Sequence, residues 1–318
     1  MTVLVLTNRM DATADVAIDV LNRRRNSVIR ADIDELTVAA ELSGSTWEGW
    51  ISARGRTADL QELTGIYYRR PSPVSAPEGY APEVARWIRE ERHWGLRGLL
   101  FALPRRRWLS WPPAVHAAEH KPHALARAAD AGLTVPRTMI TNDPDPARVF
   151  TGGPQPTLYK SFRGGGVSIR STSLLTYATE ITSADIGDSV RAAPITLQER
   201  IDKICDVRVT CVDDEVFGVT PHRAGTIPLD WRDDHGANDW STVTVPDDVR
   251  DAVASLMNDL GLRFCAADFA LDRDGRWHHL DLNPAGQWAW DHPACASIAE
   301  SLADALTRKD MPHDPHRR

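Results

Sequence analysis

The chain has 318 residues, enough for two or three packed domains at roughly 100–200 residues each. It is 42% apolar and 25% charged, which is a globular composition, and its formal charge of −7 argues against a general nucleic-acid binder. No apolar run approaches the ~20 residues that cross a bilayer, and the start of the chain has neither the basic region nor the apolar length of a secretory signal.

The N-terminal part predicts a parallel α/β unit. A strand, a helix and a second strand follow one another, and the first turn lacks a G-x-G-x-x-G motif, so no dinucleotide site is indicated there. Pro71 stops the next strand and opens a proline-rich loop, and we place the first domain boundary near residue 115. The expected elements are strands at 3–6, 27–30, 66–70 and 108–111, and helices at 13–24 and 83–103.

The rest of the chain mixes helices and strands and ends in a mostly β region. A polar loop is expected over 142–146, and a glycine-rich loop is expected after the strand at 157–161. The remaining expected elements are helices at 121–131, 247–260 and 294–306, strands at 136–140, 195–201, 205–212 and 215–222, and a hairpin over 263–283.

The hairpin over 263–283 is the most informative segment. An Asp-Gly pair between alternating strands is a strong signal for a two-residue turn, and with Asp274 and Gly275 in that turn, Asp268 lies directly opposite Asp281. Asn283 shares their face because side chains alternate along a strand. The other face collects the apolar side chains Phe269, Leu271, Leu280 and Leu282.

Two carboxylates that face each other in this way lie about 4.5–5.5 Å apart at Cβ and repel. A hard divalent cation would compensate for the repulsion, since carboxylate and amide oxygens are magnesium ligands. The alternative interpretation is a pair of solvated surface carboxylates on a polar face.

A second hairpin, over 204–223, turns at the acidic stretch 213–215. Any two-residue turn there puts Asp206, Arg208 and Arg223 on one face, where the two arginines are suited to bind anionic oxygens. The alternative is an ordinary Asp–Arg pair across the strands.

Only four of the 37 basic residues are lysines, and they are Lys121, Lys160, Lys203 and Lys309. Lys160 ends a strand shortly before Gly164, Gly165 and Gly166, and Lys121 opens a helix. A glycine-rich loop exposes backbone amides to phosphate, and a lysine adds a point charge. The alternatives are a flexible loop and ordinary surface charges.

The four cysteines form no C-x-x-C pair. Neither a zinc site nor a disulfide framework is therefore indicated, and we expect a cytoplasmic protein with reduced thiols.

The order of these features resembles the ATP-grasp ligases over about residues 116–308. Further motifs are similar to those of the ATP-grasp ribosomal peptide maturases, the graspetide synthetases related to the microviridin ligases. These motifs are Leu6-Thr7-Asn8, Tyr68-Arg69-Arg70-Pro71 and the run from Asn283 to Trp288. The resemblance implies an α/β (α+β) ATP-grasp fold with three parts: an N-terminal α/β pre-ATP-grasp domain at 1–115, a central subdomain with the Gly-rich loop at 116–193, and a C-terminal subdomain with the metal site at 194–318.

The resemblance also implies a role for each candidate residue. Lys121, Lys160 and the Gly-rich loop would contact the phosphates of ATP, and Asp206 would lie near the ribose or orient an arginine. The adenine hinge would use backbone groups of Glu199 and Ile201. The γ-phosphate and the acyl phosphate would be held by Arg208 and Arg223. The ligands of Mg²⁺ would be Asp268, Asp281 and Asn283. The family more often has Glu where this chain has Asp281.

The implied reaction joins side chains within one ribosomal precursor peptide, made of a leader and a core. An Asp or Glu carboxylate of the peptide becomes an acyl phosphate, and a Ser or Thr hydroxyl or a Lys amine closes an ω-ester or ω-amide ring. Neither a nucleic acid nor a membrane is an expected partner, a homodimer is possible, and the arginine-rich helix at 86–107 is the expected surface for the leader. The alternatives are another ATP-grasp ligase, acting on a free amino acid, and a non-catalytic peptide- or nucleotide-binding module.

Overall fold

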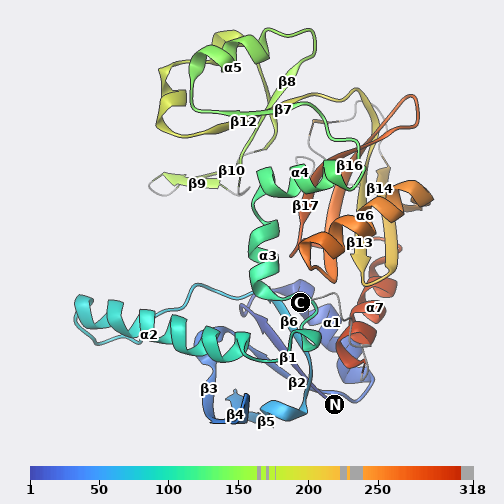
Figure 1. Ribbon diagram of the computed structural model, residues 1–318. Coiled ribbons are helices and arrows are strands. Elements are labelled where there is room, and N and C mark those ends of the chain that lie inside the picture. Colours follow the sequence, from blue (N-terminus) through green and yellow to red (C-terminus); the bar gives the residue numbers. More distant parts are fainter. Residues whose placement is uncertain (163–165, 170–171, 176, 223–227, 230–238, 309–318) are drawn as a thin grey trace.

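The structure is a computed structural model that describes residues 1–162, 166–169, 172–175, 177–222, 228–229 and 239–308 (Figure 1). Among these residues, no helix combines the length and apolarity that a bilayer crossing needs. Short 3₁₀ turns lie at Ile33–Glu35, Leu60–Glu62, Arg105–Arg107, Ser183–Asp185 and Asp188–Ala192.

The N-terminal unit contains the predicted parallel sheet. Its strand order is β2-β1-β6, and α1 connects the first two strands. A second, antiparallel sheet of order β3-β4-β5 was not predicted. The bounds are β1 Thr2–Thr7, α1 Ala12–Arg23, β2 Ser27–Ala31, β3 Thr37–Ser43, β4 Thr46–Ala53, β5 Arg56–Asp59 and β6 Leu63–Arg70.

Three helices follow β6 in the chain: α2 (Pro82–Phe101), α3 (Pro112–Ala118) and α4 (Lys121–Asp130). Helices were expected at 83–103 and 121–131, but α3 was not predicted. The predicted strand at 108–111 is wrong, because only Trp108 forms an isolated parallel bridge, to Ile66. Trp108 is instead one of the largest fully buried side chains.

The central region is a four-stranded antiparallel sheet of order β11-β8-β12-β7, with α5 packed against it. The predicted loop over 142–146 is partly wrong, because α5 begins at Pro144. Asp143 caps that helix by accepting a hydrogen bond from the Asp145 amide, and Ala147 and Phe150 are buried. The bounds are β7 Thr138–Thr141, α5 Pro144–Thr151, β8 Thr157–Lys160, β11 Thr179–Ile181 and β12 Ile195–Glu199, with a hairpin of β9 Gly166–Ile169 and β10 Thr172–Leu175.

The C-terminal region is a five-stranded antiparallel sheet of order β15-β14-β13-β16-β17. Helices α3, α4 and α6 share a hydrophobic core with the β13, β16 and β17 strands. The bounds are β13 Lys203–Val212, β14 Glu215–His222, β15 Asp239–Val243, α6 Asp247–Leu260, β16 Phe264–Asp272, β17 Trp277–Asn283 and α7 Cys295–Thr307.

The last helix returns to the N-terminal unit, where it lies beside α1 (Figure 1). Its residues Ile298 and Leu302 share one core with Val3 and Val5 of β1. Gly65 of β6 lets α7 approach closely, since a Cβ there would overlap backbone atoms of Leu306. The first strand and α7 therefore belong to one packed unit, while the domain boundaries at 115 and 193 stay a prediction.

Candidate functional site

A row of charged side chains crosses three neighbouring strands. Arg208 of β13 lies opposite Asp268 of β16, and Asp268 lies opposite Asp281 of β17. The predicted pairing of the two aspartates is therefore confirmed. The β13–β14 hairpin turns at Asp213 and Asp214, so its two-residue turn is confirmed, and Asp206 and Arg208 lie on the same face.

The turn of the acidic hairpin differs from its prediction. The Asp272 amide donates to the Arg276 carbonyl, so the turn has three residues rather than two, with Gly275 at a positive φ of 81°. An irregularity after Asp268 shifts the register by one, so that Phe269 lies opposite His279 rather than Leu280. The two departures cancel at the aspartates.

The shift brings an unpredicted histidine into the core beside the site. His279 is fully buried, packs edge to face on Phe269 at 5.3 Å between ring centroids, and has no hydrogen-bond partner for either ring nitrogen among the described residues. Burial lowers its pKa to about 4; Asp281 opposes this shift and Lys160 adds to it. The ring is therefore neutral at pH 7.

Each of the two facing aspartates has its own cation. The Arg208 Nη1 atom donates to both oxygens of Asp268, at 2.9 and 3.1 Å, and Lys121 Nζ lies 2.8 Å from Oδ2 of Asp281. The Arg208 side chain is 5% exposed and that of Asp268 is 16% exposed, so this pair is shielded from water. Two cations therefore offset the repulsion that the sequence predicts between the carboxylates.

The donor set fits a hard divalent cation. Asp268, Asp281 and Asn283 offer only carboxylate and amide oxygens, and the strand alternation places them on one face. Among the described residues, no group of three or more His, Cys, Asp or Glu side chains is arranged to hold a metal ion, and this donor set contains only two such residues, Asp268 and Asp281. The assignment of Mg²⁺ to these three residues stays a prediction.

The second predicted phosphate lysine lies on the central sheet. Lys160 Nζ is 2.5 Å from Oε1 of buried Gln198, whose amide nitrogen donates to Thr138. This chain of contacts fixes the lysine at the end of β8. Of the predicted loop glycines, Gly166 begins β9, whereas Gly164 and Gly165 lie outside the described residues, as does Arg223.

The residues expected at the nucleotide base and sugar follow β12. Glu199 forms an ion pair with Arg137 at 3.1 Å, and the Ile201 carbonyl accepts from the Lys203 amide at 3.0 Å. Asp206 is buried, and Lys203 donates to both of its oxygens at 2.6 and 2.8 Å. Lys203 therefore has a structural partner that the sequence did not predict.

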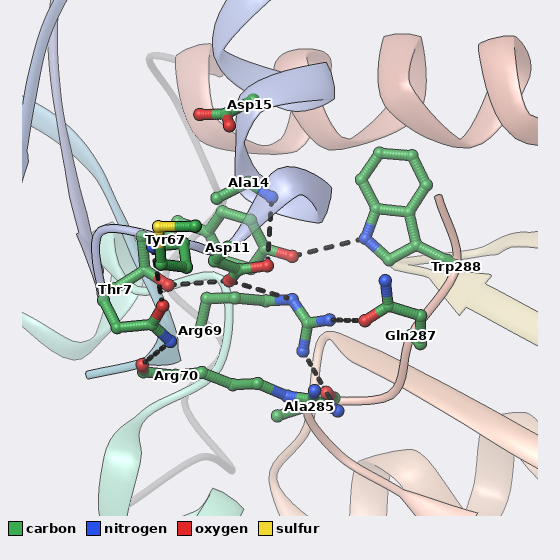
Figure 2. A network of polar contacts seen from close by, with 12 residues as sticks. Thr7, Asp11, Ala14, Asp15, Tyr67, Arg69, Arg70, Ala285, Gln287 and Trp288 are labelled. Atoms are coloured by element: carbon green, nitrogen blue, oxygen red, sulfur yellow. Dashed lines mark hydrogen bonds and ion pairs between the residues drawn. The ribbon is translucent and has the colours of Figure 1, made fainter. Parts of the chain in front are cut away.

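A buried arginine joins the N-terminal unit to the loop after Asn283 (Figure 2). Arg69 donates to the Ala285 carbonyl and, at 3.1 Å, to Oε1 of Gln287, while its Nε lies 3.8 Å from Asp11. Asp11 also accepts from the hydroxyl of Thr7 at 2.6 Å. The motifs at 6–8, 68–71 and 283–288, which are far apart in sequence, thus meet at one network.

The same loop supports the cation of the charged row. Gly286 passes so close to Arg208 that a Cβ on it would lie 2.9 Å from the guanidinium and would overlap Ala266. The guanidinium also lies 5.8 Å from the ring centre of Trp290. A glycine at position 286 is therefore required by space rather than by a strained φ angle.

Comparisons with solved structures agree with this geometry. The macrocyclase MdnC of Microcystis aeruginosa MRC, solved bound with the precursor peptide MdnA, superposes with a TM-score of 0.83 at 22% identity, covering 98% of this chain and 100% of that chain. A RiPP-associated ATP-grasp ligase of Chryseobacterium gregarium, in complex with ADP and a leader and core peptide, gives 0.84 at 18% identity, covering 98% and 97%. The chain has the ATP-grasp fold. The predicted fold is confirmed.

A further solved structure is similar at lower identity, and the sequence comparisons give no match. The D-cycloserine synthetase DcsG superposes with a TM-score of 0.58 at 13% identity, covering 96% of this chain and 99% of that chain. Neither the scan against family models nor the search of curated proteins gives a match. The likeness therefore rests on the fold alone.

The contacts of Arg69 predict that removing its guanidinium strongly lowers the free energy of unfolding. Substituting Arg69→Met keeps the apolar stem but leaves the buried Asp11 without its cation, which is expected to cost about 3–5 kcal/mol of stability. The matched control is Arg70→Met, because Arg70 is exposed and is expected to cost less than about 1 kcal/mol. Urea unfolding measures both, and equal midpoints for the two variants would contradict the central role of Arg69.

Proposed function

We propose that the protein is an ATP-dependent macrocyclase of the graspetide synthetase class. It activates Asp or Glu side chains of a ribosomal precursor peptide as acyl phosphates and closes ω-ester or ω-amide bonds with Ser, Thr or Lys side chains. The observation that carries this proposal is the charged row of Arg208, Asp268 and Asp281, capped by Lys121, in an ATP-grasp fold. MdnC, a macrocyclase solved bound with its precursor peptide, superposes over 98% of this chain.

In this proposal, the carboxylate and amide side chains bind the metal ion and the lysines bind phosphate. Asp268, Asp281 and Asn283 would hold Mg²⁺, which supplies charge neutralisation at the transferring phosphoryl group. Lys160, whose ammonium contacts Gln198, would place a positive charge at the end of β8 for the phosphates of ATP. Lys121 would bind phosphate by exchanging its contact with Asp281 for one with a phosphate oxygen. The predicted roles of Glu199, Ile201 and Asp206 at the nucleotide are kept as part of this proposal, as are those of the loop glycines and Arg223.

The chemistry needs no covalent group of the enzyme. A carboxylate oxygen of the peptide attacks the γ-phosphorus, the bond to the β,γ-bridging oxygen breaks and ADP leaves with that electron pair. The acceptor oxygen or nitrogen then attacks the acyl carbon, and phosphate leaves. Positioning and charge neutralisation dominate both steps, and the cations of this site are suited to both.

We further propose that the reaction takes place in the cytoplasm and that the domains divide at 1–115, 116–193 and 194–318. Cys211 and Cys265 lie directly opposite each other on β13 and β16, and all four cysteines are free thiols. Free thiols in this number suit a reducing compartment.

The decisive experiment incubates the protein with Mg-ATP and a small peptide rich in Thr and Asp or Glu that is encoded beside its gene. Loss of one water per ring, read by mass spectrometry, supports the proposal. Turnover on a free amino acid with an intact peptide mass would instead favour the alternative ligase, and ATP binding without ADP formation would favour a non-catalytic module.

The metal assignment predicts the behaviour of Asp281→Asn. This variant removes one carboxylate but keeps its size, so ring formation is expected to fall by a factor on the order of 10² or more while peptide binding survives. Its control is Asp274→Asn in the exposed turn of the same hairpin. Product mass and peptide titration measure the two effects, and full activity of Asp281→Asn would show that the metal assignment is wrong.

The phosphate assignment predicts that lysine cannot be exchanged for arginine at the site. Lys121→Arg and Lys160→Arg replace a compact ammonium, placed 2.8 Å from Asp281 or 2.5 Å from Gln198, by a planar fork of different reach. Each should lower ATP turnover at least about tenfold, which corresponds to about 1.4 kcal/mol in the barrier. Arg127→Lys, at a half-buried position of α4 where Arg127 pairs with Asp130 and Asp259, is the control in an ADP-release assay. Normal turnover of both lysine variants would refute the assignment.

We also propose that two copies of the chain associate through α2. Val84, Trp87 and Trp94 are 44%, 60% and 75% exposed and lie on one face of this helix at helical spacing. Trp94 also lines a cavity of about 450 Å³ between α2 and the proline-rich loop, and this cavity lies within the surface predicted for the leader. That leader site stays a prediction.

The α2 face predicts the outcome of one substitution. Trp87→Glu places a charge on the exposed apolar stripe and should convert a dimer to a monomer in light scattering after gel filtration. Val149→Glu on α5, where Val149 is 77% exposed, is the matched control and should leave the mass unchanged. A wild-type protein that is already monomeric at micromolar concentration would contradict the proposed dimer.

A further inference from the structure

A polar cavity of about 370 Å³ lies beside the predicted metal site and has no role in the assignments above. Asn283 and Ala285, at the carboxyl end of β17, form one part of its wall. The rest of the wall is formed by Tyr68, Arg69 and Arg70 of β6, Pro71, His116 of α3 and Glu119, which follows α3. The cavity therefore connects a predicted metal ligand with an imidazole and a phenol from distant parts of the chain.

The phenol and the imidazole in this cavity are hydrogen-bonded. Tyr68 Oη lies 3.2 Å from Nε2 of His116, and the two rings meet edge to face at 5.7 Å between centroids. Both side chains are half-buried. Burial raises the pKa of Tyr68, so the phenol keeps its proton at pH 7.

The imidazole is poised to accept a proton. Burial lowers the pKa of His116 below its ordinary value of 6.5; the carboxylate of Glu119, three residues later, opposes the shift, and the Arg97 guanidinium of α2 adds to it. Arg97 and Glu119 also act on Tyr68, with Asp32 as a weaker influence. A neutral His116 with a protonated Tyr68 is the expected state at pH 7.

Ring closure needs such a pair. A Ser or Thr hydroxyl must lose its proton as it attacks the acyl phosphate, and a positioned base contributes on the order of 10²–10⁴ in rate. The cations Arg208, Lys121 and Lys160 cannot accept that proton, and the carboxylates of Asp268 and Asp281 are already paired with cations. The side chains of the charged row therefore supply no free base for this step.

We propose that Tyr68 and His116 form the proton relay that activates the acceptor hydroxyl of the peptide. The acceptor proton passes to the Tyr68 oxygen as the Tyr68 proton passes to Nε2 of His116. The acceptor oxygen forms a bond to the acyl carbon, the bond from that carbon to the phosphate oxygen breaks, and phosphate leaves with the electron pair. The imidazolium then returns its proton to solvent through the cavity. This inference rests on the proposed ligase activity.

The test separates the two half-reactions. Hydroxylamine traps an acyl phosphate without a base, so His116→Gln and Tyr68→Phe should still form hydroxamate from Mg-ATP and the encoded peptide. Ring closure by either variant should fall by a factor on the order of 10²–10⁴. His123→Gln, which changes an exposed histidine of α4, is the control and should close rings normally.

A pH profile adds a readout that a purely structural role would not move. Wild-type ring closure should rise with pH through a pKa below 6.5, because only the neutral imidazole accepts a proton, and His116→Gln should lose this limb. If His116→Gln also loses hydroxamate formation, the second variant His116→Ala decides. Rescue of its ring closure by added imidazole supports the relay, and absence of rescue overturns it.

The outcomes distinguish failure of the relay from failure of the ligase. Wild-type protein that forms neither hydroxamate nor rings overturns the ligase activity, and the relay with it. Wild-type protein that closes rings, with unchanged closure in either His116→Gln or Tyr68→Phe, overturns the relay alone.

Discussion

The site depends on two carboxylates that face each other across β16 and β17. Like charges on directly opposed residues destabilise a sheet, so Asp268 and Asp281 need nearby positive charge whether or not a metal ion is bound. Arg208 meets one carboxylate from the neighbouring strand, and Lys121 meets the other from α4. The two cations offset the repulsion, and the contact between Lys121 and Asp281 links the start of α4 to β17.

The second constraint is the buried guanidinium of Arg69. Burying an arginine with no exposed side-chain surface is costly unless it is paired. Here the loop after Asn283 supplies two hydrogen-bond acceptors, and Asp11 is an ion-pair partner 3.8 Å from Nε (Figure 2). That loop also carries Gly286, which leaves room for Arg208. The loop that supports the charged row is therefore tied to the N-terminal unit by Arg69, with further hydrogen bonds from Arg70 to Ala285 and from Trp288 to Tyr67.

Local patterns predicted much of this structure, and tertiary contacts decided the remainder. The helix at 247–260 and the pairing of Asp268 with Asp281 follow from helical spacing and turn chemistry, which act within a few residues. The bulge beside His279 does not follow from such local rules, because an alternating pattern of side chains does not reveal where a strand contains one extra residue. The strands β3 to β5 lie in a small sheet with many exposed positions, so their pattern carries little apolar contrast.

Long-range sites were the hardest to predict because each member looks ordinary alone. Tyr68 and His116 are 48 residues apart, and nothing in either local sequence indicates that the phenol and the imidazole meet. Arg69 was visible only as part of a motif, without its partners. Asn283 belongs to the predicted metal site and also lines the cavity of Tyr68 and His116, together with Arg69 and Arg70. In the proposed ligase, cations that stay positive would bind phosphate, whereas a neutral group such as the His116 imidazole, whose pKa burial lowers, would take the proton from the alcohol. These two kinds of group come from separate parts of the chain, so no local sequence pattern indicates that they meet.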